Sequence, residues 1–245
     1  MNLQTIILAA GKGTRMGDEN TPKVLFKLSG KPMIRFVVNE VEKLNLSLKP
    51  IFVVGHKYDL VQKELGSSYV YAFQEGQLGT AHAVDAAKGF SLGTDVLVLY
   101  GDMPFVKTDS LKKLMKLHEQ SRPVVSMFTT TVDSFEGQWQ SLQGFGRIIR
   151  NDKNEISSIR EFKDASENER MIKEVNPGIY IFKADWLWQN IDKIQNNNAQ
   201  KEYYLTDLIQ LASEQGLVIK SVQIDPREVF GINTKEQLVL ARQLV

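Results

Sequence analysis

The sequence predicts an α/β fold: a doubly wound, mostly parallel, Rossmann-like sheet flanked by helices. Short runs of β-branched and aliphatic residues recur along the chain, each bounded by turn residues. Stretches with apolar residues at helical spacing separate the early runs. After about residue 120 the strand-like runs follow one another without such stretches, which indicates a small antiparallel excursion added to the main sheet.

Each predicted element follows from its local pattern. We expect strands over Thr5–Leu8, Ile51–Val54, Tyr69–Phe73, Asp95–Tyr100, Val124–Thr131, Gly146–Arg150, Ile156–Arg160, Ile179–Phe182 and Leu217–Val222. We expect helices over Ile34–Leu44, Ala81–Ala87, Leu111–Leu117, Asp185–Ile191, Tyr204–Glu214 and Lys235–Leu244. Strands joined by helices run parallel through right-handed crossovers, so helices should cover both faces of the sheet.

Composition excludes several classes of protein. Residues 1–245 are enough for one large domain, which is what we expect. Lys plus Arg number 30 against 29 Asp plus Glu, so the chain lacks the overall charge that attracts nucleic acid or an anionic membrane. The absence of Cys excludes disulfides and thiolate metal sites and favours a cytoplasmic location, and the three scattered His argue against a histidine-built metal site. The opening apolar run ends at Ala10, too short for a signal peptide or a membrane helix.

The segment Leu8–Gly17, which closes the first predicted strand, has the character of a phosphate-binding loop. Small residues such as Ala10, Gly11 and Gly13 let the backbone approach a ligand and direct N–H groups at phosphate oxygens. The segment is neither the Walker pattern nor the dinucleotide fingerprint, because Met16 occupies the place of the third glycine. Taken alone, Gly11 and Gly13 are equally compatible with an ordinary tight turn.

The charge around this loop is positive. Residues 9–27 carry four cationic side chains against two carboxylates, which leaves a local charge of four minus two, or +2. The cationic residues are Lys12, Arg15, Lys23 and Lys27, and the acidic ones are Asp18 and Glu19. A chain with almost no net charge therefore concentrates positive charge beside a glycine-rich loop, which is what a local anion site requires.

The loop, followed by Pro22-Lys23-Val24-Leu25, resembles the signature of sugar-phosphate nucleotidyltransferases. Further motifs fall in the order and approximate spacing of the uridyltransferase domain of bifunctional N-acetylglucosamine-1-phosphate uridyltransferases. They are Gly30–Met33, Gln74–His82, Leu99–Pro104, Gly144–Ile148, Glu161–Asp164, Glu174–Asn176, Asn197–Asp207 and Gly231–Asn233. The similarity spans essentially the whole chain.

The resemblance implies a Mg²⁺-dependent enzyme of sugar nucleotide biosynthesis. Such an enzyme transfers a uridylyl group from UTP to a sugar 1-phosphate, such as N-acetylglucosamine 1-phosphate, and releases a UDP-sugar and pyrophosphate. The sugar phosphate is already an ionised nucleophile at neutral pH, so in-line attack on the α-phosphorus needs alignment and charge neutralisation more than an acid or a base.

The resemblance also assigns roles to individual residues. The catalytic residues would be Arg15, Lys23 and Asp102, and the metal ligands Asp102 and Asn233. The nucleotide would contact Leu8, Ala9, Ala10, Gly11, Gly13, Thr14, Arg15, Gln74, Gln77, Gly79 and Thr80. The sugar phosphate would contact Tyr100, Gly146, Glu161, Asn176, Tyr204 and Thr206.

Several of these residues have a second interpretation from the sequence alone. Gln74 and Gln77 are exposed-type polar residues after a strand, and each offers a donor and an acceptor to a uracil edge. For Thr80 we expect capping of the following helix to be the main role. Asn233 comes after the predicted strand Leu217–Val222, and two roles compete for its side chain: binding a metal and capping the last helix. Without the resemblance, Glu161 is most simply a solvated strand charge.

Asp102 follows an apolar strand at the carboxyl edge where open α/β sheets bind ligands, although an ordinary strand-end turn would also place a carboxylate there.

The sequence departs from the family mainly on the sugar side. Pro177 stands where Thr or Ser is usual and removes a backbone donor and a hydroxyl. Lys201 replaces a usual Gly, and the connection 133–144 is longer than is typical. We therefore expect residues 1–120 to form an intact nucleotide-binding half, residues 121–230 an altered sugar-binding half, and residues 231–245 the metal-binding Asn and a terminal helix.

The chain ends where bifunctional relatives continue into a left-handed β-helix acetyltransferase domain, so we expect neither acetyl transfer nor the associated trimer. A separate acetyltransferase partner is compatible with this, and the oligomeric state stays open. Two alternatives to the uridylyltransferase also stay open: a nucleotidyltransferase with another nucleotide or phosphorylated acceptor, and a non-catalytic regulatory or binding module.

Overall fold

The computed structural model describes residues 1–244, in which the apolar runs form twelve strands. These are β1 (Leu3–Leu8), β2 (Lys27–Leu28), β3 (Lys31–Pro32), β4 (Ile51–Val54), β5 (Val70–Phe73), β6 (Asp95–Tyr100), β7 (Val125–Thr131), β8 (Gly146–Arg150), β9 (Ile156–Arg160), β10 (Glu174–Asn176), β11 (Tyr180–Lys183) and β12 (Ile219–Gln223). Ten of them form one mixed sheet in the order β5-β4-β1-β6-β11-β7-β10-β8-β9, with β12 paired to β7, while β2 and β3 pair separately.

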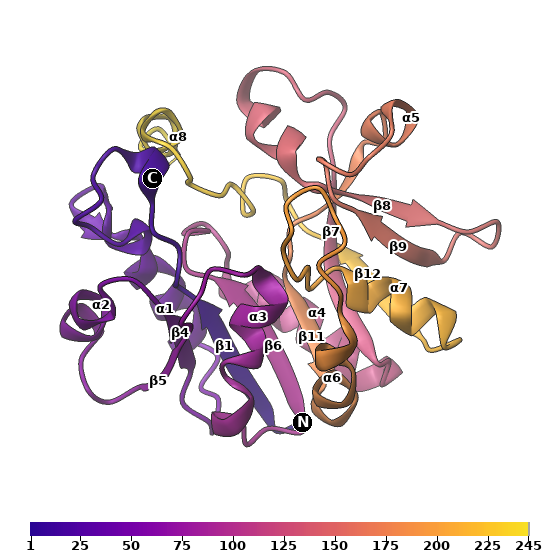
Figure 1. The fold of residues 1–245 in the computed structure, drawn as a ribbon, viewed down its shortest axis with the longest axis horizontal. Helices are drawn as coiled ribbons and strands as arrows, with labels where there is room; N and C mark the ends of the chain where they lie inside the picture. The colour runs from indigo at the N-terminus through magenta and orange to yellow at the C-terminus, as the bar shows by residue number, and fades with distance from the viewer. Residues whose placement is uncertain (245) are drawn as a thin grey trace.

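Strands β5, β4, β1 and β6 are parallel, whereas β11 runs antiparallel to both β6 and β7. Strands β8, β9 and β10 form the antiparallel excursion that the sequence predicts, and the β8–β9 hairpin projects from the sheet (Figure 1). The predicted fold class is therefore confirmed. The sheet is continuous from β6 to β11, so the segments before and after residue 120 share one sheet.

Eight α-helices and five short 3₁₀ helices connect the strands within residues 1–244. The α-helices are α1 (Met33–Glu42), α2 (Tyr58–Leu65), α3 (Thr80–Asp85), α4 (Thr108–Ser121), α5 (Glu167–Arg170), α6 (Ala184–Asn190), α7 (Asp207–Glu214) and α8 (Lys235–Ala241). The 3₁₀ helices are η1 (Thr14–Met16), η2 (Lys23–Leu25), η3 (Lys88–Phe90), η4 (Gly137–Gly144) and η5 (Ile191–Lys193). No helix of this part of the chain is both long and apolar enough to cross a membrane.

Alternating side chains bury both faces of the sheet. Along β1, Ile6 and Leu8 pack in one cluster with residues of α3, α6 and α7, whereas Ile7 packs in the other with residues of α1, α2 and α4. Helices therefore cover both faces, as the parallel core requires.

A third cluster fixes the loop that follows β1. Met16 is fully buried and packs with Met33, Phe230 and Leu238, which belong to α1, the approach to α8, and α8 itself. In Figure 1 the yellow α8 accordingly lies beside the indigo segment that follows β1. Met16 in the place of a glycine thus anchors the loop to the last helix.

The structure contains short elements that were not predicted. Helix α2 buries only Val61 and Leu65, and the others, β2, β3, α5 and β10, have two to four residues each. The strand predicted before Asn233, Leu217–Val222, forms as β12, and residues 224–233 after it contain neither strand nor helix. There the Ile232 N–H donates to the Asp102 carbonyl at 2.9 Å, so the segment is held by the loop after β6 instead of by a neighbouring strand.

Candidate active site

Two adjoining cavities lie at the carboxyl ends of β1 and β6. The loop cavity, of about 220 Å³, is lined by Leu8, Ala10, Gly11, Lys23, Val24, Gln74, Gln77, Gly79, Thr80, Ala83, Tyr100, Asp102 and Glu202. The hairpin cavity, of about 200 Å³, is lined by Thr80, Tyr100, Met103, Gly144, Phe145, Gly146, Glu161, Asn176, Pro177, Gly178, Gln200, Glu202, Tyr204 and Thr206. The two share Thr80, Tyr100 and Glu202, so together they form one cleft with two ends.

The glycine loop packs against Lys23. Gly13 has a φ of 73°, and a Cβ there would lie 3.0 Å from the Lys23 Cα. A Cβ on Gly11 would lie 3.3 Å from the Lys23 Cε. Both positions are therefore restricted by close approach, and Gly13 also by its left-handed backbone. The small residues that suggest a phosphate loop hold the Lys23 side chain against that loop.

The Lys23 ammonium joins three distant segments. It donates to the Asp102 carboxylate and, at 2.9 Å, to the Asn233 Oδ1. Asp102 follows β6 and Asn233 precedes α8, so the sheet edge and the terminal helix meet at this one cation. The Lys23 and Asp102 side chains are 19% and 9% exposed, which makes this a partly buried ion pair at the floor of the loop cavity.

Asn233 does not cap α8. The N-cap is Thr234, whose Oγ1 accepts from the Gln237 N–H at 3.3 Å, while the Gln237 Oε1 accepts from the Thr234 N–H at 3.2 Å. This capping box satisfies the helix terminus. The competing interpretation of Asn233 is therefore wrong, and its side-chain carbonyl is directed to Lys23.

The Asp102 and Asn233 oxygens suit a hard divalent cation. Both already bind the same positive charge, so they converge on one cation position. A carboxylate and an amide carbonyl are oxygen ligands of the type that Mg²⁺ prefers. Within residues 1–244 no group of three or more His, Asp or Glu is arranged to hold a metal. A cation here would take two protein ligands and leave its other positions to water or substrate oxygens.

Two glutamines line the far wall of the loop cavity. Gln74 is only 5% exposed, and its Nε2 donates to the His82 Nδ1 at 3.0 Å and to the Gly79 carbonyl at 3.3 Å. The expectation of an exposed-type residue is wrong for Gln74, because the turn before α3 folds over it. Gln77 is exposed and donates to the Ala10 carbonyl at 2.6 Å. Both amides are thus oriented by the protein.

Thr80 links α3 to a distant segment and does not cap the helix. The N-cap of α3 is Gly79, and the Thr80 Oγ1 accepts from the Leu205 N–H at 3.0 Å. Gly79 has a φ of 118°, and a Cβ there would lie 2.4 Å from the Tyr203 carbonyl oxygen. The expected cap is therefore wrong because a tertiary partner takes the hydroxyl.

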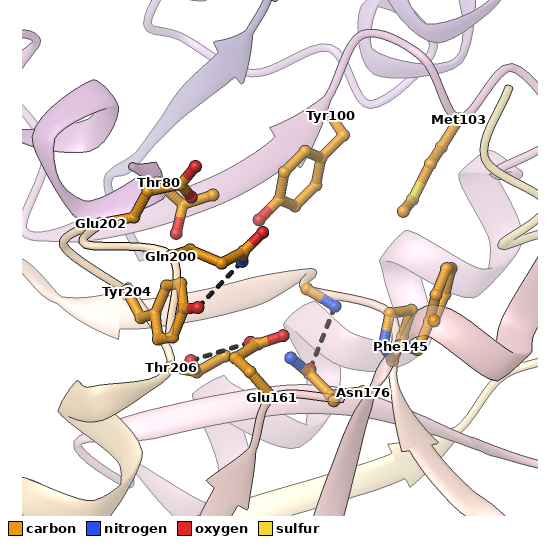
Figure 2. Close-up of a pocket in the computed structure, with 14 residues that line it drawn as sticks. Thr80, Tyr100, Met103, Phe145, Glu161, Asn176, Gln200, Glu202, Tyr204 and Thr206 are labelled. Carbon is orange, nitrogen blue, oxygen red and sulfur yellow. Dashed lines mark hydrogen bonds between the residues drawn. The ribbon is translucent and has the colours of Figure 1, made fainter. Parts of the chain in front are cut away.

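Hydrogen bonds between side chains shape the hairpin cavity (Figure 2). The Thr206 hydroxyl donates to the Glu161 Oε1 at 2.9 Å, and the Gly178 N–H donates to the Asn176 Oδ1 at 3.0 Å. The Gln200 Nε2 donates to the Tyr204 hydroxyl at 2.8 Å. In Figure 2, Glu161, Asn176 and Thr206 lie on one side of the cavity, opposite Tyr100 and Met103.

Burial raises the pKa values of three ionisable groups that line the hairpin cavity, Glu161, Tyr100 and Tyr204. Burial raises the pKa of the Glu161 carboxyl, and the carboxylates of Asp207 and Asp164 raise it further. Burial also raises the pKa of the Tyr100 phenol, with a contribution from the charges of Glu161 and Asp102, and raises that of Tyr204 to about 12. Tyr100 therefore keeps a hydroxyl proton that can be donated to a ligand, whereas the Tyr204 hydroxyl already donates to the Asp164 Oδ2 at 3.2 Å.

This geometry can be compared with that of known proteins. Residues 5–175 match the sequence model of a family described as the MobA-like NTP transferase domain. The chain belongs to this family.

Close relatives of this nucleotidyltransferase are longer proteins. It is 41% identical over 242 residues to the bifunctional protein GlmU of Caldicellulosiruptor saccharolyticus, covering 97% of this chain and 50% of the relative. It is 44% identical over 238 residues to the same-named protein of Fervidobacterium nodosum, covering 96% and 49%. The chain spans about half the length of these curated relatives.

Solved structures share the fold. A UDP-glucose pyrophosphorylase in complex with UDP-glucose superposes with a TM-score of 0.79 at 16% identity, covering 100% of this chain and 98% of the other. An inositol-1-phosphate CTP transferase from T. maritima gives a TM-score of 0.73 at 15% identity, covering 96% and 90%.

Most of the predicted site residues of this nucleotidyltransferase line the cleft. All six predicted sugar-side residues line the hairpin cavity, and Lys23 and Asp102 line the loop cavity. Ala9 is instead buried in the core, at 3% exposed. Gly13, Thr14 and Arg15 lie on the loop outside both cavity linings, with Arg15 exposed, so their roles stay predictions.

Several residues that line the hairpin cavity were assigned no role from the sequence. These are Met103, Phe145, Gln200 and Glu202. All four lie inside motifs that carry the resemblance. Their position next to assigned residues is the sequence feature that could have identified them as part of the site. The departure Pro177 also lines this cavity, and η4 within the connection 133–144 leads directly into Gly144 and Phe145.

Proposed function

We propose that this nucleotidyltransferase transfers a uridylyl group from UTP to a sugar 1-phosphate and releases a UDP-sugar and pyrophosphate. The observation that carries the proposal is the convergence of Lys23, Asp102 and Asn233 at the loop cavity, which Lys23 and Asp102 line. A triphosphate on one side and a phosphorylated acceptor on the other would bring their charged ends to this cluster.

The proposed chemistry requires positioning of two anions. The acceptor phosphate is ionised at neutral pH and needs no base, so the enzyme has to align it with the α-phosphorus and compensate the growing charge. Lys23, a compact point charge held by the loop, would compensate charge at the α-phosphate. Arg15, on η1, would meet the departing pyrophosphate with its planar set of donors.

Asp102 and Asn233 would hold Mg²⁺, as their converging oxygens suggest. Bound there, the ion would neutralise phosphate oxygens of both substrates and fix their relative orientation. The protein's own part would be to hold both oxygens beside the Lys23 position, and the Ile232–Asp102 backbone bond and the capping box of Thr234 support this.

The oriented amides of Gln74 and Gln77 support uracil as the base, and Gly79 allows close approach. Tyr100, Glu161 and Tyr204 offer hydroxyl and carboxyl groups to sugar hydroxyls in the hairpin cavity. The names of the GlmU relatives and of UDP-glucose pyrophosphorylase are compatible with this choice. A cytoplasmic enzyme acting beside a separate acetyltransferase fits the same proposal.

A second candidate is a nucleotidyltransferase with another nucleotide or phosphorylated acceptor. One structural neighbour is described as a CTP transferase and another as a putative glucose-1-phosphate thymidylyltransferase from Bacillus anthracis, with a TM-score of 0.76 at 21% identity over 99% of this chain and 94% of the other. A non-catalytic module is less well supported, since binding alone does not need the joint arrangement of Lys23, Asp102 and Asn233.

The test is release of pyrophosphate from UTP, CTP, dTTP and ATP with a set of sugar 1-phosphates and Mg²⁺. We expect UTP to be preferred, and a strong preference for CTP or dTTP would contradict the assignment of Gln74 and Gln77. Asp102→Ala should abolish Mg²⁺-dependent turnover with little loss of thermal stability. Asp109→Ala, which changes an exposed carboxylate on α4, is the matched control. Unchanged activity of Asp102→Ala would overturn the metal assignment.

A further inference from the structure

A third cavity lies behind the turn that carries Gly79 and Thr80. This back cavity has a volume of about 270 Å³, larger than the loop cavity or the hairpin cavity, and shares no lining residue with either. Its walls include Leu78, His82 and Asp85 from the turn and α3, Ile191 from η5, and Tyr203. It is therefore separate from the site described above.

Asp85 is an unpaired carboxylate in this wall. Its Oδ1 is buried without a hydrogen-bond partner among residues 1–244. Burial raises the pKa of Asp85, the nearby Asp192 carboxylate raises it further, and Lys88 and His82 lower it. Lys88 is already engaged, because its Nζ donates to the Asp192 Oδ2 at 2.8 Å. Asp85 is half-buried, and a partly desolvated carboxylate with one unpaired oxygen is stabilised when a cation binds beside it.

Besides the carboxylates of Asp85 and Asp192, the lining consists of apolar side chains, His82 and Tyr203. His82 Nδ1 accepts the hydrogen bond from Gln74, so the neutral ring carries its proton on Nε2. Leu78, Ile191 and Ile194 provide aliphatic surface, and Tyr203 adds an aromatic ring. A ligand that matches this lining has a positive donor group at one end and a small apolar body at the other.

We propose that the back cavity binds a small organic cation, an ammonium or amidinium group on an apolar body, with its charge paired to Asp85. A neutral ligand of the same shape would leave the carboxylate unpaired. An anion would face Asp85 and Asp192 together.

Binding in the back cavity is expected to affect the nucleotide, a consequence that rests on the proposed function. His82 holds Gln74, which lines the loop cavity. The Tyr203 N–H donates to the Leu78 carbonyl at 2.7 Å, and the Ala81 N–H donates to the Tyr203 carbonyl at 2.9 Å. A ligand that fixes these walls also fixes the turn against which the base would lie, so cation and nucleotide affinities change by the same factor.

The binding test uses benzylammonium as the probe and benzyl alcohol as its uncharged counterpart, titrated into the whole protein by calorimetry. For a probe of this size we expect a Kd on the order of 1 mM for benzylammonium and at least about tenfold weaker binding of the alcohol. Asp85→Asn should weaken benzylammonium binding about tenfold without lowering Tm, because it removes a buried charge. Equal binding of the two probes, or unchanged binding to Asp85→Asn, would overturn the proposal.

Two control variants locate the probe. Glu161→Gln, in the acidic hairpin cavity, and Asp109→Asn, on the exposed face of α4, should leave benzylammonium binding unchanged. The His82 ring resonances should shift in NMR spectra during the titration. Loss of binding in Glu161→Gln with no shift at His82 would place the probe in the hairpin cavity and sink the assignment.

The coupling is tested by measuring the Kd of UTP with and without saturating benzylammonium. We expect a change of at least about threefold in the parent protein and none in Asp85→Asn. An unchanged Kd for UTP would overturn the coupling. Failure of UTP to bind under any condition would contradict the proposed function, while the benzylammonium titration would still decide the cation site.

Discussion

The two ends of the cleft differ in their charged groups: only the loop cavity is lined by a cationic side chain within residues 1–244. The loop cavity contains the Lys23 ammonium beside small backbone-lined positions, whereas no Lys or Arg within residues 1–244 lines the hairpin cavity, whose ionisable groups are carboxyls and phenols. The difference separates the parts of the substrates: phosphates are stabilised on the side of Lys23, and neutral hydroxyl groups find acceptors and donors on the side of Glu161.

The two ends are also built differently. The loop side depends on local sequence, since Gly11 and Gly13 bring the backbone against Lys23 within a few residues. The hairpin side depends on pairs that are distant in sequence, such as Thr206 with Glu161. Changes on the loop side should therefore affect the chemical step, and changes on the hairpin side should affect which acceptor binds.

The largest effect is expected from Lys23→Gln. Removing a charge aimed at a developing anion typically reduces kcat by about 10²–10³, and we expect a loss of this size in steady-state turnover with less change in the KM of the acceptor. The variant also leaves Asp102 and Asn233 without their shared cation. Mg²⁺ should therefore raise the Tm of Lys23→Gln more than that of the parent protein.

Lys12→Gln, at an exposed position of the same loop, is the matched control and should have a smaller effect. If the two substitutions reduce kcat equally, the local positive charge determines activity and the position of Lys23 does not. The assignment of the chemical step to the loop side of the cleft would then lose its main support.

Glu161→Gln tests the hairpin side. The KM of the acceptor should rise about tenfold, because the amide presents an NH₂ group where the carboxyl presents its second oxygen to the sugar hydroxyls, while the KM of UTP stays unchanged. The same substitution should raise the stability of the protein at higher pH. The raised pKa means that the unfolded chain ionises first, near the ordinary value of 4.5, so the parent protein loses stability as pH rises above that value.

The Glu161→Gln variant does not lose stability in this pH range, because its amide does not ionise. Thermal denaturation should therefore show equal Tm values for parent and Glu161→Gln near pH 4 and a higher Tm for the variant near pH 8. A variant that is less stable near pH 8 would mean that the carboxylate is a stabilising structural charge, and the functional interpretation of this end would fail.

Pro177→Thr should alter acceptor choice by a smaller factor. The Gly178 N–H donates to Asn176 across residue 177, so the turn does not depend on proline. Threonine would restore a backbone donor and a hydroxyl beside the acceptor. We expect kcat/KM for N-acetylglucosamine 1-phosphate relative to glucose 1-phosphate to rise about three- to tenfold. If the parent protein already prefers N-acetylglucosamine 1-phosphate clearly, Pro177 has little influence on the choice.

The sequence predicts the sheet well because its strands are short, buried and bounded by turns. The predicted ranges of β4 and β6 match the structure residue for residue, since each is a continuous apolar run with turn residues at its ends. Helix α2 escaped prediction because two buried residues in eight give little periodicity.

Site residues were less predictable where a distant partner decides their role. The Thr80 hydroxyl is taken by Leu205, 125 residues away, which no local pattern reveals. The role of Asn233 could have been predicted from the sequence. Thr234 and Gln237, three residues apart, form a capping-box pattern, which leaves the preceding Asn233 side chain available for another contact.

The smallest effect is expected from Lys201→Gly, which restores the glycine that is usual at this position in the family. Lys201 has a φ of 56°, in the left-handed region that a side chain disfavours by roughly 1 kcal/mol. Its neighbours Gln200 and Glu202 line the hairpin cavity, but Lys201 does not.

The Lys201→Gly substitution should raise the free energy of unfolding by up to about 1 kcal/mol, or Tm by about 2–4 °C, with kinetic constants unchanged. Lys201→Ala keeps the strain and is the matched control. Equal Tm values for the two variants would show that the left-handed backbone carries no cost, and altered kinetics in Lys201→Gly would show that this residue belongs to the acceptor side of the site.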